Sequence, residues 1–101
     1  MSAAVITSRR ALSGPHLFTA ETKAALIALQ AERPRWDLTF GVGAGGDEWA
    51  CFSDTLSRRG ASFTVAVQSD GSLAAWDADE IDVGIYDTAA EVVAALRQSG
   101  L

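Results

Sequence analysis

A series of short runs between residues 36 and 86, in which apolar and polar side chains alternate, constrains the fold more than any other feature of the sequence. Alternation with a period of two is typical of β-strands that bury one face. The connections between the runs are short and rich in Gly, Asp and Ser, whereas parallel strands need crossovers of about a dozen residues or more. The sequence therefore predicts an antiparallel meander. Its strands are expected at 36–42, 48–53, 62–68, 73–76 and 81–86.

The run at 48–53 fits two kinds of secondary structure. As a strand it would place Trp49 and Cys51 on one face, and Ala50 and Phe52 on the other. As a helix it would continue to Gly60. Aromatic and small apolar residues occupy both faces of the run, which favours the strand. The sheet is therefore expected to have four to five strands.

Two further patterns concern the end of the sheet. Asp70-Gly71 lies between two strand-like runs, and this dipeptide favours a primed turn and a β-hairpin. In the last run, Ile81, Val83 and Ile85 alternate with their neighbours and predict one apolar face.

Helices are predicted on both sides of the strand runs. The first covers about 20–32, where Thr19 is a suitable N-cap and Pro34 stops the run. The second begins at Thr88, which forms a capping-box pattern with Glu91, and ends before Gly100. Their expected apolar faces are Ala25, Leu26, Ala28 and Leu29 in the first, and Ala89, Val92, Val93 and Leu96 in the second.

These elements predict an α+β fold in which both helices pack on one face of the sheet. The chain of 101 residues is expected to form a single domain, 1–101. Residues 1–16 are expected to be a loosely structured N-terminal segment, or to contribute an edge strand at 3–7.

Composition excludes several classes of protein. The hydrophobic fraction of 49% and the charged fraction of 21% are typical of a globular chain, not a disordered one. The lone Cys51 cannot form an internal disulfide, and no Cys/His cluster is available for zinc. The start lacks the pattern of a signal peptide, and the longest apolar stretch is far shorter than a membrane span. We therefore expect a cytoplasmic protein with no membrane partner, no metal and no cofactor.

Negative charge is concentrated in the second half of the chain. Residues 60–98 carry seven acids and a single base, Arg97, whereas residues 1–59 carry six acids and seven bases. An acidic surface repels the phosphates of nucleic acid and attracts basic protein surfaces. Nucleic acid is therefore not expected as a partner, and a basic protein is.

Two motifs fit a ligand only formally. Residues 41–46 match the dinucleotide pattern G-x-G-x-x-G, but Asp47 and Glu48 would place negative charge where a pyrophosphate has to bind. A hairpin loop is the better interpretation. The acidic run that begins at Asp77 resembles the start of a calcium loop, but its sixth residue is Asp82 instead of Gly and its twelfth is Thr88 instead of Glu. A solvated turn is expected there.

No catalytic set emerges from the sequence. His16 and Cys51 are single residues without the local signature of a nucleophile and its base. We therefore assign no catalytic residue, and a protein that is not an enzyme is the favoured expectation.

The three tryptophans, Trp36, Trp49 and Trp76, fall on three different predicted strands. They belong either to the core or to an exposed face of the sheet, where Trp contributes strongly to binding. If the helices cover one face only, some of Trp49, Phe52, Trp76 and Tyr86 must lie on the other.

These observations predict a small acidic protein that binds a basic partner, of the inhibitor, immunity-protein or antitoxin type. The residues expected to bind are Trp76, Asp77, Asp79, Glu80 and Asp82, with Asp70 in a second group. One alternative is a small-molecule binder or small enzyme, with a pocket between sheet and helices to which Trp49, Phe52 and the glycine loop contribute. The other is a self-associating protein, for example a homodimer that pairs through a strand edge.

Overall fold

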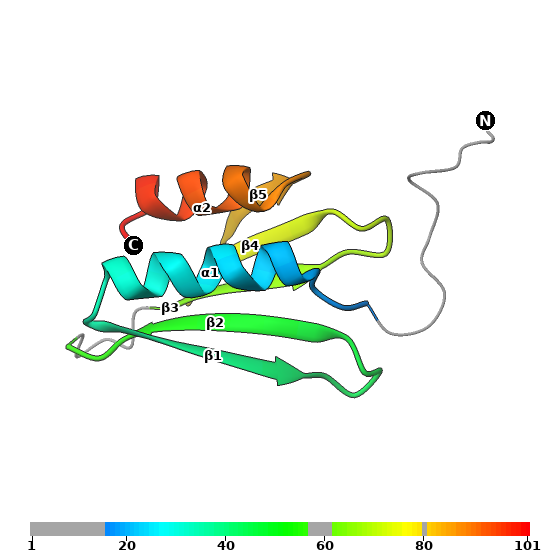
Figure 1. Ribbon diagram of the computed structural model, residues 1–101, viewed down its shortest axis with the longest axis horizontal. Coiled ribbons are helices and arrows are strands. Elements are labelled where there is room, and N and C mark those ends of the chain that lie inside the picture. Colours follow the sequence, from blue (N-terminus) through cyan, green and yellow to red (C-terminus); the bar gives the residue numbers. More distant parts are fainter. Residues whose placement is uncertain (1–15, 57–61, 80) are drawn as a thin grey trace.

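The computed structural model describes residues 16–56, 62–79 and 81–101 of the chain. In chain order the elements are α1 (Ala20–Glu32), β1 (Trp36–Val42), β2 (Glu48–Asp54), β3 (Ser62–Val67), β4 (Leu73–Asp77), β5 (Asp82–Tyr86) and α2 (Ala89–Gln98). The two helices lie side by side on one face of the sheet (Figure 1). The possible edge strand at 3–7 falls outside the described residues.

The five strands form one antiparallel sheet in the order β1-β2-β3-β4-β5, so each strand pairs with the next along the chain. The predicted α+β meander is therefore confirmed, including the strand at 48–53. The helix considered for that run is wrong, and with it the βαβ unit that the glycine motif would have required. The glycine motif forms a hairpin loop instead, closed by hydrogen bonds from Gly43 N to Asp47 O and from Gly46 N to Gly43 O.

Both helices begin where the capping residues predict. The Thr19 side chain accepts a hydrogen bond from Thr22 N, and Thr88 and Glu91 form the complete capping box. The helices run in the same direction (Figure 1). Their C-terminal ends are tied together by an ion pair between Arg97 and Glu32, with Nη2 and Oε1 2.6 Å apart.

The core lies between the helices and the face of the sheet toward them. Its fully buried large side chains are Phe52, Leu26, Leu29, Leu96, Val65 and Val92. The predicted apolar face of α1 needs one correction, because Ala28 is exposed and Thr22 is buried instead. The reason is that α1 also packs against α2, so its buried stripe follows Thr22, Leu26 and Leu29.

The predicted alternation of β5 is wrong because the pairing between β4 and β5 contains a bulge. Ala75 pairs with Gly84, but the next residue, Trp76, pairs with Asp82, so the register skips Val83. Ile81 and Ile85 are 63% and 69% exposed, whereas Val83 packs against the core. Regular alternation would put Asp82 and Gly84 on the same face of the sheet. Because of the extra residue they lie on opposite faces instead.

The hairpin between β3 and β4 is confirmed, but its turn is not of the primed, two-residue type. Hydrogen bonds from Gly71 N to Gln68 O and from Gln68 N to Ser72 O enclose a loop of residues 69–71. Asp70 Oδ1 accepts hydrogen bonds from both Ser72 N and Ser72 Oγ, and Gly71 has a φ of 89°. A three-residue loop of this kind ends on a residue with positive φ, which glycine adopts without steric cost.

Within the described part of the chain, neither α1 nor α2 is long and apolar enough to cross a membrane.

Candidate functional site

The face of the sheet that points away from the helices carries the features of a binding surface. We call it the open face, because both described helices pack on the opposite side. Two rows of cross-strand neighbours form its centre. One row contains Thr39, Cys51, Thr64, Trp76 and Asp82, and the other contains Gly41, Trp49, Ala66, Ala74 and Ile85. Small and aromatic side chains dominate these rows.

A groove of about 470 Å³ runs over the open face. Trp49 and Trp76 lie on two strands that both pair with β3, and Cys51, Thr64 and Ala66 line the groove between them. Both tryptophans are half-buried.

Trp49 is positioned by the glycine opposite to it. A Cβ atom on Gly41 would lie 2.1 Å from Cζ2 of Trp49 and 2.5 Å from Cε2 and Cη2. The indole ring therefore lies directly over the Gly41 backbone, in a space that the side chain of any other residue at position 41 would occupy. This is the arrangement in which an aromatic side chain covers a glycine on the neighbouring strand.

Trp76 has an acidic neighbour because of the bulge. Asp82 is its cross-strand partner, and the two side chains share the open face. Asp37, on β1 at the other edge of the sheet, also faces this side, since it pairs with Ser53. Asp37 and Asp82 are both exposed. The open face therefore combines tryptophans with carboxylates at both edges.

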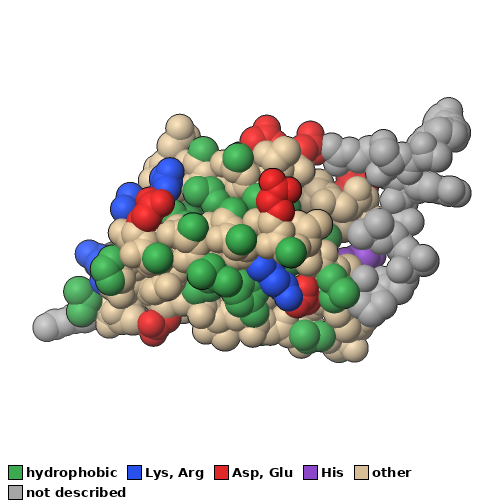
Figure 2. Space-filling view, in the orientation of Figure 1, with side chains coloured by type: hydrophobic (Ala, Val, Ile, Leu, Met, Phe, Trp, Pro, Cys, Tyr) green, Lys and Arg blue, Asp and Glu red, His purple; other side chains and the backbone are tan. Residues whose placement is uncertain are grey.

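The described bases are all engaged on the helix side of the sheet or at the helix ends. Lys23 pairs with Glu48, Arg97 pairs with Glu32, and Arg33 donates to the Leu101 carbonyl. Figure 2 shows acidic and basic side chains next to each other in this layer.

The last of these bases, Arg35, pairs with the buried Asp54. The hydrogen bond to Asp54 and the charge of that carboxylate raise the pKa of Arg35. Among the described residues, no base is therefore left to neutralise Asp37 or Asp82 on the open face.

Asp47 and Glu48, the two acids after the glycine loop, bind the segment before α1. Asp47 Oδ1 accepts a hydrogen bond from His16 N at 2.8 Å, and Glu48 Oε1 accepts one from Phe18 N at 2.9 Å. Lys23 Nζ lies 2.9 Å from Glu48 Oε2. The hydrogen bond to Lys23 lowers the pKa of Glu48, against the effect of burial, and the Phe18 N–H contributes in the same direction. Together these contacts fix the segment before α1 to the start of β2.

The structure separates the residues predicted to bind. Trp76 and Asp82 lie together on the open face, while Asp77 and Asp79 lie at the β4–β5 turn. Asp77 Oδ1 accepts hydrogen bonds from Asp79 N and Ile81 N, so this carboxylate organises the turn. Glu80 lies outside the described residues.

Asp70 lies in the β3–β4 turn, at the opposite end of β4 from Asp77. The structure therefore does not bring it together with the other predicted residues. Asp37, Thr64 and Ala66 also lie on the open face but are not among the residues predicted to bind. Their positions in the alternating runs are the signal that could have placed them on the face of Trp49 and Trp76.

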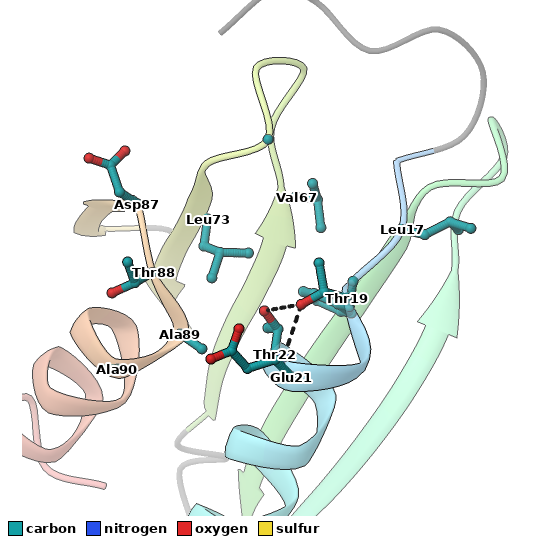
Figure 3. Close-up of a pocket in the computed structure, with 12 residues that line it drawn as sticks. Leu17, Thr19, Glu21, Thr22, Val67, Leu73, Asp87, Thr88, Ala89 and Ala90 are labelled. Atoms are coloured by element: carbon teal, nitrogen blue, oxygen red, sulfur yellow. Dashed lines mark hydrogen bonds between the residues drawn. The ribbon is translucent and has the colours of Figure 1, made fainter. Parts of the chain in front are cut away.

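A second pocket, of about 440 Å³, lies between the N-terminal ends of the helices and the β3–β4 turn (Figure 3). Thr19 and Thr88 stand at its two sides, and Leu73 and Val67 line it from the sheet. The cap hydroxyls are used by their own helices. Thr19 Oγ1 accepts a hydrogen bond from Thr22 N and donates one to Thr22 Oγ1, and Thr88 Oγ1 accepts one from Glu91 N. Phe52, suggested for a pocket between sheet and helices, is fully buried in the core and does not line this one.

The single histidine and the single cysteine of the chain have different neighbours. His16 Nδ1 lies 3.4 Å from Asp47 Oδ1, whereas Cys51 is half-buried on the open face with its Sγ 3.8 Å from Ser53 Oγ. In the described ranges no group of three or more His, Cys, Asp or Glu side chains could hold a metal ion.

Searches against protein-family models, curated proteins and solved structures find no match to this chain.

Proposed function

We propose that this protein is a binding protein that engages a basic protein partner through the open face of its sheet. The observation that carries the proposal is the coincidence, on one uncovered face, of Trp49 and Trp76 with carboxylates that have no described basic partner. An inhibitor, immunity protein or antitoxin-like neutraliser would use such a surface.

The distribution of tryptophans and carboxylates on the open face supports a protein partner. Aromatic side chains dominate binding energy when they become buried at the centre of an interface, and charges at the rim set the association rate and the choice of partner. The open face has this arrangement, with Trp49 and Trp76 over the central strands and Asp37 and Asp82 on the two edge strands. Its net charge favours a partner surface rich in Lys or Arg.

The test compares charge reversal on the two sides of the molecule. Asp82→Lys changes the charge of the open face by two units. The double variant Ala94→Lys with Gln98→Lys makes the same change on the exposed side of α2. Each protein is immobilised, exposed to lysate of its source, washed, and eluted with a salt gradient. Basic proteins identified by mass spectrometry are then purified and titrated against the three immobilised proteins.

The proposal expects a basic protein that binds the wild type and the α2 variant with similar Kd. Asp82→Lys should weaken this binding by about tenfold or more, because a like charge facing a basic partner costs at least about 1.4 kcal/mol. Equal retention by all three proteins would contradict the use of the open face. Failure to retain any basic protein would contradict the proposed class of partner.

A further inference from the structure

We infer that Trp76 and Asp82 together form a receptor for one arginine side chain of the partner. The inference rests on the proposed function and specifies which chemical group is recognised and where.

The bulge in the β4–β5 pairing brings Asp82 next to Trp76. In a regular antiparallel ladder that continues from Ala75 opposite Gly84, Trp76 would face Val83, and Asp82 would face Asp77 on the helix side. The bulge instead sets Asp82 opposite Trp76 on the open face. Bulges commonly re-aim a side chain beside a functional site. Here the re-aimed group is a carboxylate, and its new neighbour is an indole.

The indole and the carboxylate of this pair offer a cation two different contacts. Trp76 and Asp82 are cross-strand neighbours on the open face, so one ligand group can contact both side chains. A guanidinium is planar and stacks on an indole, while its N–H groups form two parallel hydrogen bonds with a carboxylate. Lysine offers a compact, strongly hydrated charge without this planar fork. An aromatic ring next to a carboxylate therefore favours arginine over lysine.

Within the described part of the chain, the pair is accessible to a ligand. Asp82 is exposed and Trp76 is half-buried at the wall of the open-face groove. Among the described residues, the cation found near an aromatic ring is Lys23, whose Nζ lies 5.9 Å from the centre of the Phe40 ring on the other side of the sheet. No described base therefore occupies the place that a partner arginine would take.

The experiment uses three peptides that differ in one side chain: acetyl-Ser-Gly-Arg-Gly-Ser-amide, its lysine counterpart and its citrulline counterpart. Each is titrated into the ¹⁵N-labelled protein, and binding is followed by the indole N–H signal of Trp76, assigned with a Trp76→Phe variant. Citrulline keeps the shape of arginine without its charge, and lysine keeps the charge without its shape.

We expect the arginine peptide to bind about fivefold more tightly than the lysine peptide, because a guanidinium can stack on the indole and form two parallel hydrogen bonds with the carboxylate at the same time. Citrulline should bind more weakly still. Asp82→Asn should remove most of the preference for arginine. The matched variant Asp79→Asn changes the charge equally in the neighbouring turn and should preserve the preference.

Three results would overturn the inference: equal affinity for arginine and lysine, equal effects of Asp82→Asn and Asp79→Asn, or no response of the Trp76 signal to the arginine peptide. None of these requires the proposed function to fail, because a basic protein could still bind the open face through other contacts. The proposed function fails separately, when a full-length basic partner is retained equally by the wild type and Asp82→Lys. Both substitutions of aspartate are at exposed positions, so the test does not depend on a variant of the core.

Discussion

Replacing Gly41 by alanine tests whether the Trp49 ring lies on the Gly41 backbone as the structure describes. The new Cβ would lie 2.1–2.5 Å from three atoms of the indole ring, which is far inside van der Waals contact. The Gly41 backbone does not have a positive φ, so alanine adds no backbone strain at this position. Any loss of stability must therefore come from displacement of the Trp49 side chain.

The size of the effect follows from two opposing terms. A Trp side chain buries about 150–250 Å² in full, and the ring face on Gly41 represents about 60 Å² of it, or about 1.5 kcal/mol at 25 cal/mol per Å². Alanine in a strand is favoured over glycine by about 0.5–1 kcal/mol. The difference predicts a net loss of about 0.5–1 kcal/mol in the free energy of unfolding. For a domain of this size the loss corresponds to a fall of about 2–5 °C in Tm.

Thermal unfolding followed by circular dichroism gives the stability, and the indole N–H signals give the environment of Trp49. Gly43→Ala is the matched control, since its Cβ would meet its nearest neighbour at 3.7 Å, an ordinary contact, and it should not lower Tm. In a Trp49→Ala background, Gly41→Ala should become neutral or stabilising, because the clash is gone. A Gly41→Ala protein that is as stable as the wild type, with unchanged Trp49 signals, would refute the reasoning.

Two further predictions concern pH and the core. Because the pKa of Glu48 is lowered in the folded protein, its stabilising effect is present above the unfolded value of about 4.3 and is lost as the pH falls through the folded value. Urea midpoints should therefore be lower for Glu48→Gln than for the wild type at pH 7, and the difference should shrink as the pH falls below about 4; a difference independent of pH would contradict this. Phe52→Ala should cost about 3–5 kcal/mol because Phe52 is fully buried at the centre of the core. Ile85→Ala, on the open face, should stay within about 0.5 kcal/mol of the wild type, and urea unfolding of both variants would show a different order if the two faces were assigned wrongly.

The elements of the fold could be predicted because their signals are local. Thr19 and Thr88 mark the helix starts by their own hydrogen bonds, and the short connections allow only antiparallel pairing of neighbouring strands. Alternation left open which of the four aromatic residues considered for the open face would lie there, and the structure places Trp49 and Trp76 on it. Phe52 and Tyr86, considered with them, lie on the helix side instead.

The site could be predicted only in part because it depends on pairing between strands. Asp77 and Asp70 are acids like Asp82, but their carboxylates are used inside turns, and the sequence does not distinguish a turn carboxylate from a free one. The contact of the Trp49 ring with Gly41 depends on the register of β1 against β2. Neither relation is visible within a single segment of the chain.

The bulge in β5 is the point at which folding and the proposed site meet. Ile85 is held on the open face by its pairing with Ala74, so regular alternation would put Val83 outside and bring Asp82 opposite Asp77 on the helix side. Two carboxylates in that position would repel each other next to an apolar core, and Val83 would lose its contacts with that core. The skipped residue avoids both costs, and the Tyr86 hydroxyl, which donates to the Val83 carbonyl at 3.1 Å, holds the chain in this form. The same bulge therefore protects the core and places Asp82 beside Trp76 on the open face, where the arginine receptor that we propose would use its carboxylate.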